Sequence, residues 1–178
     1  MAEAFSNSLT RAAGSVVIKT GSSVAAASTE ITVTANTGVV IGQLVDNTNY
    51  IAGTKVADVV GTTIKTDRAS TNSVTASSQT VKFLGVTTAY TSMATKSILV
   101  GGTFSNNTDS QVALTVHVND GSIGITAALA SKIPVPTGSS FVISDAGKTI
   151  LESGDKLEVY CDSDNAIDIN LSILTGVS

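Results

Sequence analysis

The sequence has little charge and a single cysteine, and each shortage excludes a class of protein. Charged residues make up 13% of the 178 residues, and the formal net charge is −4. The 10 Lys and Arg residues are scattered, whereas binding to a phosphate backbone needs clustered basic side chains, so we expect no nucleic-acid partner. The lone Cys161 has no partner for an internal disulfide, which excludes a small secreted scaffold held together by disulfides.

Aromatic side chains and long apolar runs are also scarce. With no Trp, 3 Tyr and 4 Phe, an aromatic platform for carbohydrates or stacked bases is difficult to build. No apolar run approaches the roughly 18 residues that span a bilayer, and the N-terminus lacks the basic-then-apolar pattern of a signal peptide. We therefore expect a soluble chain that is made in a cytoplasm and has no membrane partner.

The strongest positive signal is an alternation of apolar and polar residues with a period of two, which predicts half-buried β-strands. In "IDINLSIL", residues 167–174, the apolar side chains of Ile167, Ile169, Leu171 and Ile173 fall on one face. In "KLEVYC", residues 156–161, Leu157, Val159 and Cys161 are expected to point inward, and Lys156, Glu158 and Tyr160 outward. The segment 111–125 places Val112, Leu114, Val116 and Val118 on one face and turns at Asn119-Asp120-Gly121, which predicts a hairpin.

The N-terminal part has a different pattern of hydrophobicity, because its apolar segments are short and separated by Gly, Asn and Thr. They are "GSVVIKTG", "EITVT", "GVVIGQLVDN", "TKVADVV" and "TTIKTD". Short strands at close spacing predict a small meander or open barrel. A polar Ser/Thr-rich stretch follows, and helical periodicity is almost absent. We predict an all-β protein with an N-terminal arm (1–13), a small β domain (14–77) and an antiparallel β-sandwich (78–178).

Two short motifs resemble ligand sites but lack residues that those sites require. Gly147-Lys148-Thr149 resembles the end of a phosphate-binding loop, but Val142 stands where that loop needs glycine, and the following residues predict strands rather than a helix. We expect a turn at Gly147. The acidic stretch 162–165 could offer oxygen ligands to Ca²⁺, but it lacks the glycine and the later glutamate of an EF-hand loop, so we predict a turn between two strands.

The only histidine and the only cysteine do not predict an active site either. One His and one Cys cannot fill a structural zinc site. Cys161 alternates inward with apolar neighbours, which predicts a small core residue, while His117 is expected on the opposite, polar face of its strand. The sequence therefore predicts no catalytic, cofactor-binding or metal-binding residues, no cofactor, no small-molecule substrate and no enzymatic activity.

The C-terminal half contains three sequence elements built from turn and core residues. They are a Pro-x-Pro-x-Gly-Ser element (Pro134, Pro136, Gly138 and Ser139), a Leu-x-x-Gly-Asp-x-Leu-x-Val element (Leu151, Gly154, Asp155, Leu157 and Val159) and a closing Asp-x-x-Leu-Ser-Ile-Leu strand (Asp168 with Leu171 to Leu174). Through these elements the C-terminal half resembles a β-sandwich module of tailed-bacteriophage virion proteins. The segment 38–67, with Gly53, Thr54, Val56 and Gly61 to Thr63, is similar to a short β element of phage tail and neck proteins.

This resemblance implies a structural protein of the virion that is assembled in the cytoplasm of the host bacterium. The expected position is the neck, a collar or the tail, with other virion proteins as partners and with a homo-oligomer in a symmetric ring or trimer. Sparse charge fits a chain whose surface is partly covered by neighbours. A capsid decoration protein and a glycan-binding module of a host-recognition fibre remain the alternatives.

Overall fold

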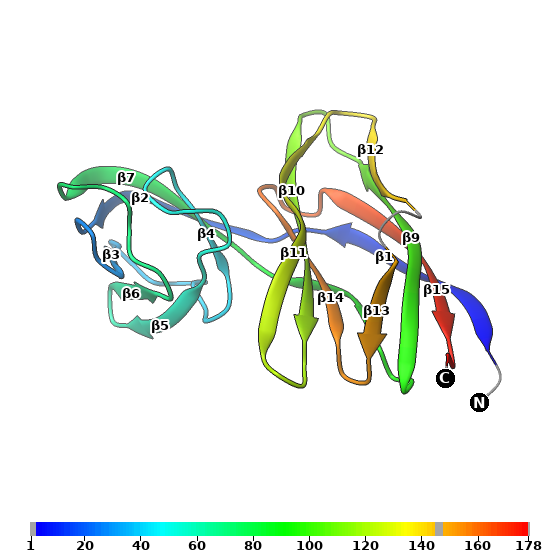
Figure 1. The fold of residues 1–178 in the computed structure, drawn as a ribbon. Coiled ribbons are helices and arrows are strands. Elements are labelled where there is room, and N and C mark those ends of the chain that lie inside the picture. The colour runs from blue at the N-terminus through cyan, green and yellow to red at the C-terminus, as the bar shows by residue number, and fades with distance from the viewer. Residues whose placement is uncertain (1–2, 145–147, 178) are drawn as a thin grey trace. The chain divides into compact units, whose positions relative to one another are not determined.

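Every regular element of the protein is a β-strand within residues 3–144 and 148–177, which the computed structural model describes (Figure 1). All pairings between neighbouring strands are antiparallel. The predicted all-β class is confirmed. The predicted turn at Gly147 lies outside the described residues.

The chain divides into two compact units, and the first unit is discontinuous. Unit 1 combines residues 1–14 with residues 87–178, and unit 2 consists of residues 15–86. Within unit 1, the backbone N–H of Gly14 donates a hydrogen bond of 3.3 Å to the hydroxyl of Thr87. The point where the chain leaves unit 1 is therefore adjacent to the point where it returns.

The domain boundaries predicted from the sequence are wrong in two places. The predicted N-terminal arm, residues 1–13, contains strand β1 (Ala4–Ala13), which belongs to unit 1. The predicted boundary at residue 77 falls within strand β7 (Ala76–Leu84) of unit 2. Polar side chains misled the prediction because Ser77, Ser78 and Thr80 occupy exposed positions of β7 and therefore resemble a linker.

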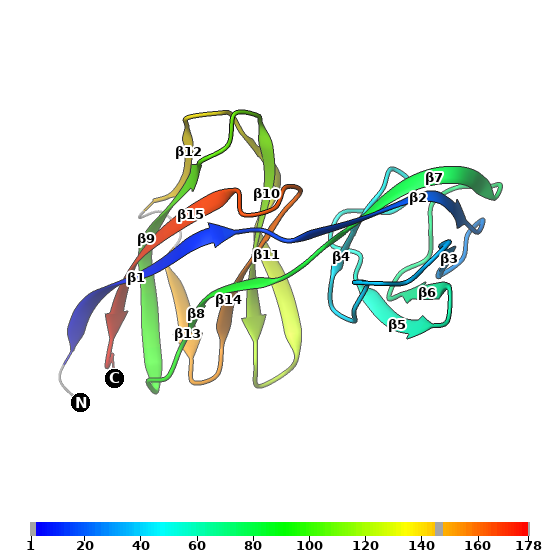
Figure 2. The ribbon, with the colours of Figure 1, turned by 180° about the vertical axis from the view of Figure 1, so that it is seen from behind.

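Unit 1 contains a five-stranded sheet with the order β1-β15-β9-β12, in which β13 also pairs with β9. Figure 2 shows β1 running beside β15 at one edge. Besides β1, the strands are β9 (Lys96–Asn106), β12 (Ser140–Ile143), β13 (Thr149–Glu152) and β15 (Ile167–Thr175).

The second sheet of unit 1 has four strands in the order β11-β10-β14-β8. Its strands are β8 (Thr87–Thr91), β10 (Val112–Asp120), β11 (Ile125–Val135) and β14 (Lys156–Cys161). β10 and β11 form the predicted hairpin, but its turn lies at residues 121–124, because Asn119 and Asp120 still belong to β10. Apolar side chains from both sheets share one core, so unit 1 is a β-sandwich.

Burial confirms most of the predicted strand faces in unit 1. All four alternating residues of β15 are buried, as are three of the four in β10, with Val118 partly buried. In β14 the inward prediction is right, but the outward prediction is wrong for Glu158 and Tyr160, which are 8% and 1% exposed. Alternation identifies the face on which a side chain lies, but not whether that face is covered.

Unit 2 is a single six-stranded sheet with the order β4-β7-β2-β3-β6-β5. Besides β7, its strands are β2 (Val16–Val24), β3 (Glu30–Thr32), β4 (Leu44–Asp46), β5 (Val56–Val60) and β6 (Thr63–Thr66). Each of the short N-terminal segments expected as a strand contains one of them. An isolated bridge between Leu44 and Lys55 connects the two ends of the sheet, which curls around its own core without closing into a regular barrel.

Candidate functional site

Lys148 and Thr149, the described residues of the Gly-Lys-Thr motif, lie at the start of a strand. Thr149 begins β13 and pairs with Leu99 of β9, and Lys148 is exposed just before it. A phosphate-binding loop would lead into a helix, whose N-terminal amides cradle the phosphate. The described residues after the motif continue as a strand, where a phosphate-binding loop would begin a helix.

The acidic stretch after β14 forms a turn whose polar groups bind the backbone. The Asp162 carboxylate accepts a hydrogen bond of 2.8 Å from the N–H of Ala113, and Asn165, with a φ of 50°, donates its N–H to the carbonyl of Gly14. Side-chain oxygens that cap backbone amides are ordinary turn chemistry. Among the described residues, no group of three or more His, Cys, Asp or Glu side chains could hold a metal ion.

Cys161 and His117 lie on opposite faces of the same sheet. Cys161 is fully buried in the core of the sandwich, and burial, with a smaller contribution from Asp162, raises the pKa of its thiol to about 12. His117 of β10 pairs with Glu158 of β14 on the other face. A protonated thiol separated from the imidazole by the sheet cannot act as an activated nucleophile.

The face of the four-stranded sheet that carries His117 holds a buried polar cluster that the sequence did not predict. The hydroxyl of Tyr160 donates to one carboxylate oxygen of Glu158 at 3.2 Å, and the amide of Asn119 donates to the other at 2.9 Å. The His117 ring packs against the Tyr160 ring with their centroids 5.3 Å apart. Burial, with a smaller contribution from Glu158, raises the pKa of Tyr160, so its phenol stays a hydrogen-bond donor. This network connects β10 and β14.

An exposed apolar row crosses the outer face of the five-stranded sheet. Phe5 of β1 lies opposite Leu174 of β15, Leu174 lies opposite Ile98 of β9, and Ile98 lies opposite Ile150 of β13. Phe5 is 64% exposed and Ile150 61% exposed, and the two residues between them are partly exposed. We call these four residues the outer apolar row. Single exposed apolar residues are common, whereas an aligned set across four strands is a feature that protein interaction surfaces share.

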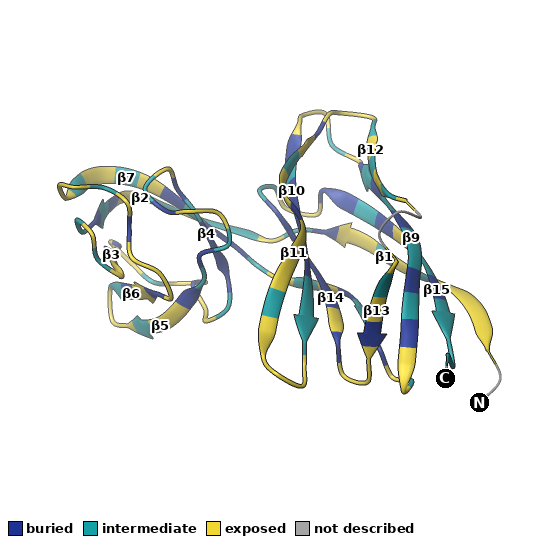
Figure 3. Ribbon diagram, in the orientation of Figure 1, coloured by how far each residue is buried: buried dark blue, intermediate teal, exposed yellow. Residues whose placement is uncertain are grey.

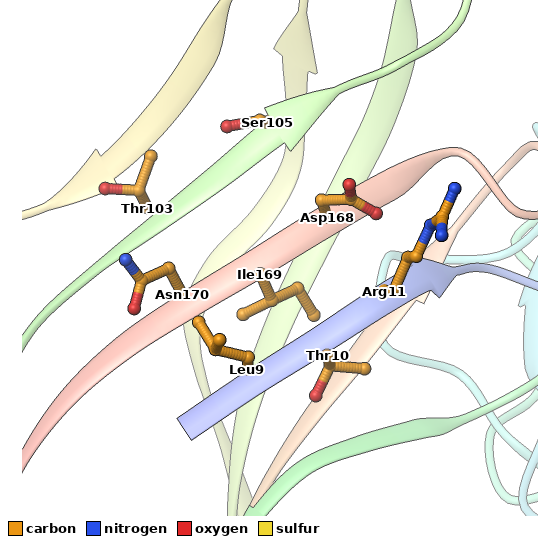
Figure 4. A pocket seen from close by; sticks show the side chains of 8 residues that line it. All are labelled: Leu9, Thr10, Arg11, Thr103, Ser105, Asp168, Ile169 and Asn170. Carbon is orange, nitrogen blue, oxygen red and sulfur yellow. The ribbon is translucent and has the colours of Figure 1, made fainter. Parts of the chain in front are cut away.

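Next to this row, the same face is hollowed between β1, β15 and β9 (Figure 4). The hollow has a volume of about 400 Å³ and is lined by Leu9, Thr10, Arg11, Thr103, Ser105, Asp168, Ile169 and Asn170. The Asp168 carboxylate accepts a 2.8 Å hydrogen bond from the N–H of Ala12, and the Ser105 hydroxyl bonds that of Ser140 at 2.9 Å. Among its lining residues, none is a nucleophile paired with a general base, so this arrangement suits binding better than catalysis.

The comparisons with known proteins leave the site to be judged on its geometry. No protein-family model matches the sequence, and no curated protein and no solved structure matches it. In the part of the chain that the structure describes, no helix has the length and hydrophobicity needed to cross a membrane.

Proposed function

We propose that the protein is a non-enzymatic structural component of a tailed-phage virion and acts through protein-protein contacts in a multi-copy assembly. A neck, collar or tail-associated position fits this role best, with assembly in the cytoplasm of the host bacterium. The observation that carries the proposal is the outer apolar row, which spans four strands of one sheet and is exposed or partly exposed in the single chain. The assignment to a phage particle is supported by the resemblance of the C-terminal sequence elements.

In the structure, the Leu-x-x-Gly-Asp element holds two turns of the sandwich in place, which suits a component of a particle. In the Leu-x-x-Gly-Asp element, Leu151 is fully buried and Asp155 is 4% exposed. The two oxygens of the Asp155 carboxylate accept hydrogen bonds from the N–H groups of Glu152 and Gly121, which belong to two different turns. A sandwich with its turns fixed in this way offers a preorganised surface, and preorganisation lowers the entropic cost of association.

The proposal predicts that the protein is present in many copies in purified virions of the phage that encodes it. Quantitative mass spectrometry of those particles measures the copy number, and antibody labelling in the electron microscope gives the position. Label at the neck, collar or tail supports the proposal, whereas label over the capsid surface favours a decoration protein. Detection only in the soluble fraction of infected cells would overturn the proposal.

A variant pair tests whether the outer apolar row is the contact surface. Ile150→Asn removes an exposed apolar side chain from the row, and we expect it to reduce the copy number in particles. Ile18→Asn is the matched control, because Ile18 is 56% exposed but lies on β2 of unit 2. Equal incorporation of both variants would contradict the role of the row.

The hollow beside the row supports a second candidate, a glycan-binding module of a host-recognition fibre. A guanidinium, a carboxylate, an amide and three hydroxyls line it, and such groups can bind the hydroxyls of a sugar. Saturable binding to a glycan array that is lost in Arg11→Ala would favour this function. No binding above background would reject it.

A further inference from the structure

Of the edge strands of unit 1, β1 is the one best suited to pair with a further strand. It pairs with β15 on one side and with no other described strand (Figure 2). The pairing is regular from Ala4 to Thr10, and a register shift follows between Thr10 and Ala13. The hydroxyl of Ser8 donates a 3.1 Å hydrogen bond to the carbonyl of Ala89, which holds the strand in place. A regularly paired edge strand presents a row of backbone N–H and C=O groups that can pair with another strand.

The other edges of unit 1 are less suited to pairing. β12 and β13 are each only 4 residues long, and β8 has 5. β11 is long, but its pairing with β10 shifts register twice, and Lys132 has a φ of 50°. Bulges and short strands are the usual means of protecting an edge, whereas β1 is regular over Ala4–Thr10, has its bulge only at its C-terminal end, and carries no proline and no lysine.

The side chains of β1 are arranged symmetrically about Asn7. The odd-numbered residues from Phe5 to Arg11 lie on the outer face, where Phe5 is 64% and Leu9 is 74% exposed. Figure 3 shows that most of β1 is exposed. Phe5 and Leu9 are equally distant from Asn7 along the chain. The same is true of Glu3 and Arg11, the only charged residues in the first fourteen positions, and they carry opposite charges.

This symmetry matters because a two-fold axis relates two identical strands that pair in an antiparallel manner. A residue on the axis lies opposite itself, and residues equally distant from it on either side lie opposite each other. With Asn7 on the axis, each Glu3 faces the Arg11 of the other copy, and each Phe5 faces the other Leu9. If the axis passed through a neighbouring residue instead, outer-face residues would still lie opposite each other, but Glu3 and Arg11 would not.

We propose that two copies of this chain pair edge to edge through antiparallel β1 strands, with Asn7 on the two-fold axis. The inference rests on the proposed function as a multi-copy assembly component, and it identifies one of the contacts of that assembly. Pairing joins the five-stranded sheets of two copies into one continuous sheet. The outer apolar row of each copy then continues from Phe5 into Leu9 of the other copy, so the contact also covers apolar surface.

A disulfide cross-link in the full-length chain tests the register. In an antiparallel pair, opposite Cα atoms are about 4.5–5.5 Å apart. That spacing lies within the range of about 4.4–6.8 Å that a disulfide allows. Asn7→Cys should therefore form a covalent dimer under mild oxidation. Ser172→Cys is the control, because Ser172 lies opposite Asn7 on the same face, one strand further from the edge.

In the proposed dimer the two copies of Ser172→Cys stand three strand spacings apart, about 14 Å, which is too far for a disulfide. The native Cys161 is buried and does not compete. A covalent dimer from Asn7→Cys and none from Ser172→Cys supports the proposal. Equal cross-linking of the two variants, or none of either, overturns it.

Charge reversal tests the same register without an engineered cysteine. Glu3→Arg places like charges opposite each other at two symmetric positions, and we expect the dimer dissociation constant to rise about tenfold. Arg11→Glu should have the same effect. The double variant restores both pairs and should return the constant to the wild-type value. A double variant that is as weak as the single ones contradicts this register.

Failure of this inference is distinguishable from failure of the proposed function. If the cross-link does not form but the protein is abundant in virions, the β1 pairing is wrong and the structural role stands. If the cross-link and the charge rescue succeed but virions lack the protein, the pairing stands and the structural role is wrong. Light scattering at several concentrations measures the dimer in each case.

Discussion

Replacing Asp155 by alanine tests how a single carboxylate stabilises unit 1. One oxygen of Asp155 accepts a 3.0 Å hydrogen bond from the N–H of Gly121 in the β10–β11 turn. The other accepts a 2.8 Å bond from the N–H of Glu152 in the β13–β14 turn. The side chain is 4% exposed, so its removal leaves two amides without their acceptor and opens space that the turns must fill.

The expected loss follows from these two bonds. A hydrogen bond to a charged group contributes about 1.5–3 kcal/mol to stability. Both bonds are only partly buried, so water can replace part of the loss, and we use the lower value. Asp155→Ala should therefore lower the free energy of unfolding by about 3 kcal/mol, and Asp155→Asn, which keeps one carbonyl acceptor, by about half as much.

Amide hydrogen exchange provides the measurement, because it reports on individual turns and on each unit separately. Exchange at Gly121 and Glu152 should accelerate most, and chemical denaturation of unit 1 gives the overall change. Asp109→Ala is the control, since Asp109 is exposed in a loop of the same unit. A change for Asp155→Ala within about 0.5 kcal/mol of this control, the usual range of a surface substitution, would refute the argument.

Three further predictions concern the core and the turns of unit 1. Leu171→Ala should cost about 2–5 kcal/mol in chemical denaturation because Leu171 is fully buried, and a value near zero would contradict the register of β15. Gly14→Ala should cost about 1–3 kcal/mol from backbone strain alone, because Gly14 has a φ of +119° and a Cβ there would collide with the carbonyl of Ser163; an unchanged melting temperature would refute this. The Cys161 thiol, with its pKa raised to about 12, should react with alkylating reagents only after unfolding. The folded state binds the thiol proton more tightly than the unfolded state does. The stability that this difference contributes is therefore complete below about pH 8.5 and is lost as the pH rises toward the folded-state pKa. Alkylation of the folded chain at the rate of a free thiol would contradict the burial.

The sequence predicted the strands whose two faces differ. β15 alternates strictly between apolar and polar residues, and its buried face agrees with the prediction residue by residue. Most short strands of unit 2 were also predictable, because Gly and Asn mark their ends. Hydrophobic periodicity and turn chemistry are local properties, so a single sequence displays them directly.

The features that the sequence did not predict depend on residues far apart in the chain. β1 has only two large apolar side chains and resembles a polar arm, since its partner β15 lies more than 150 residues away. Glu158 and Tyr160 carry polar groups and were expected in water, but they bond each other and neighbouring polar groups in a buried cluster. The discontinuity of unit 1 leaves no local mark in the sequence either.

The candidate binding surface also depends on residues that are far apart in the sequence. Phe5, Ile98, Ile150 and Leu174 come from four separate segments, and only the sheet order aligns them in the outer apolar row. The symmetric spacing of Glu3, Phe5, Leu9 and Arg11 is visible in the sequence, but it has a meaning only once β1 is known to be an edge strand. The prediction that the chain has no catalytic site, by contrast, rests on residue types and spacing alone.

The insertion of unit 2 between β1 and the rest of unit 1 sets an order of events during synthesis. Residues 15–86 are contiguous, so unit 2 can fold as it leaves the ribosome. β1 cannot form its strand pairing until β15, more than 150 residues later, has been synthesised. Once unit 2 has folded, the 2.7 Å hydrogen bond between Gly85 N–H and the Ser15 carbonyl holds its two ends together. The loop that β1 and β15 must close is then shorter by about 70 residues, which lowers the entropic cost of closure. A folded unit 2 therefore speeds the folding of unit 1, and a lesion confined to unit 2 delays the completion of the sandwich.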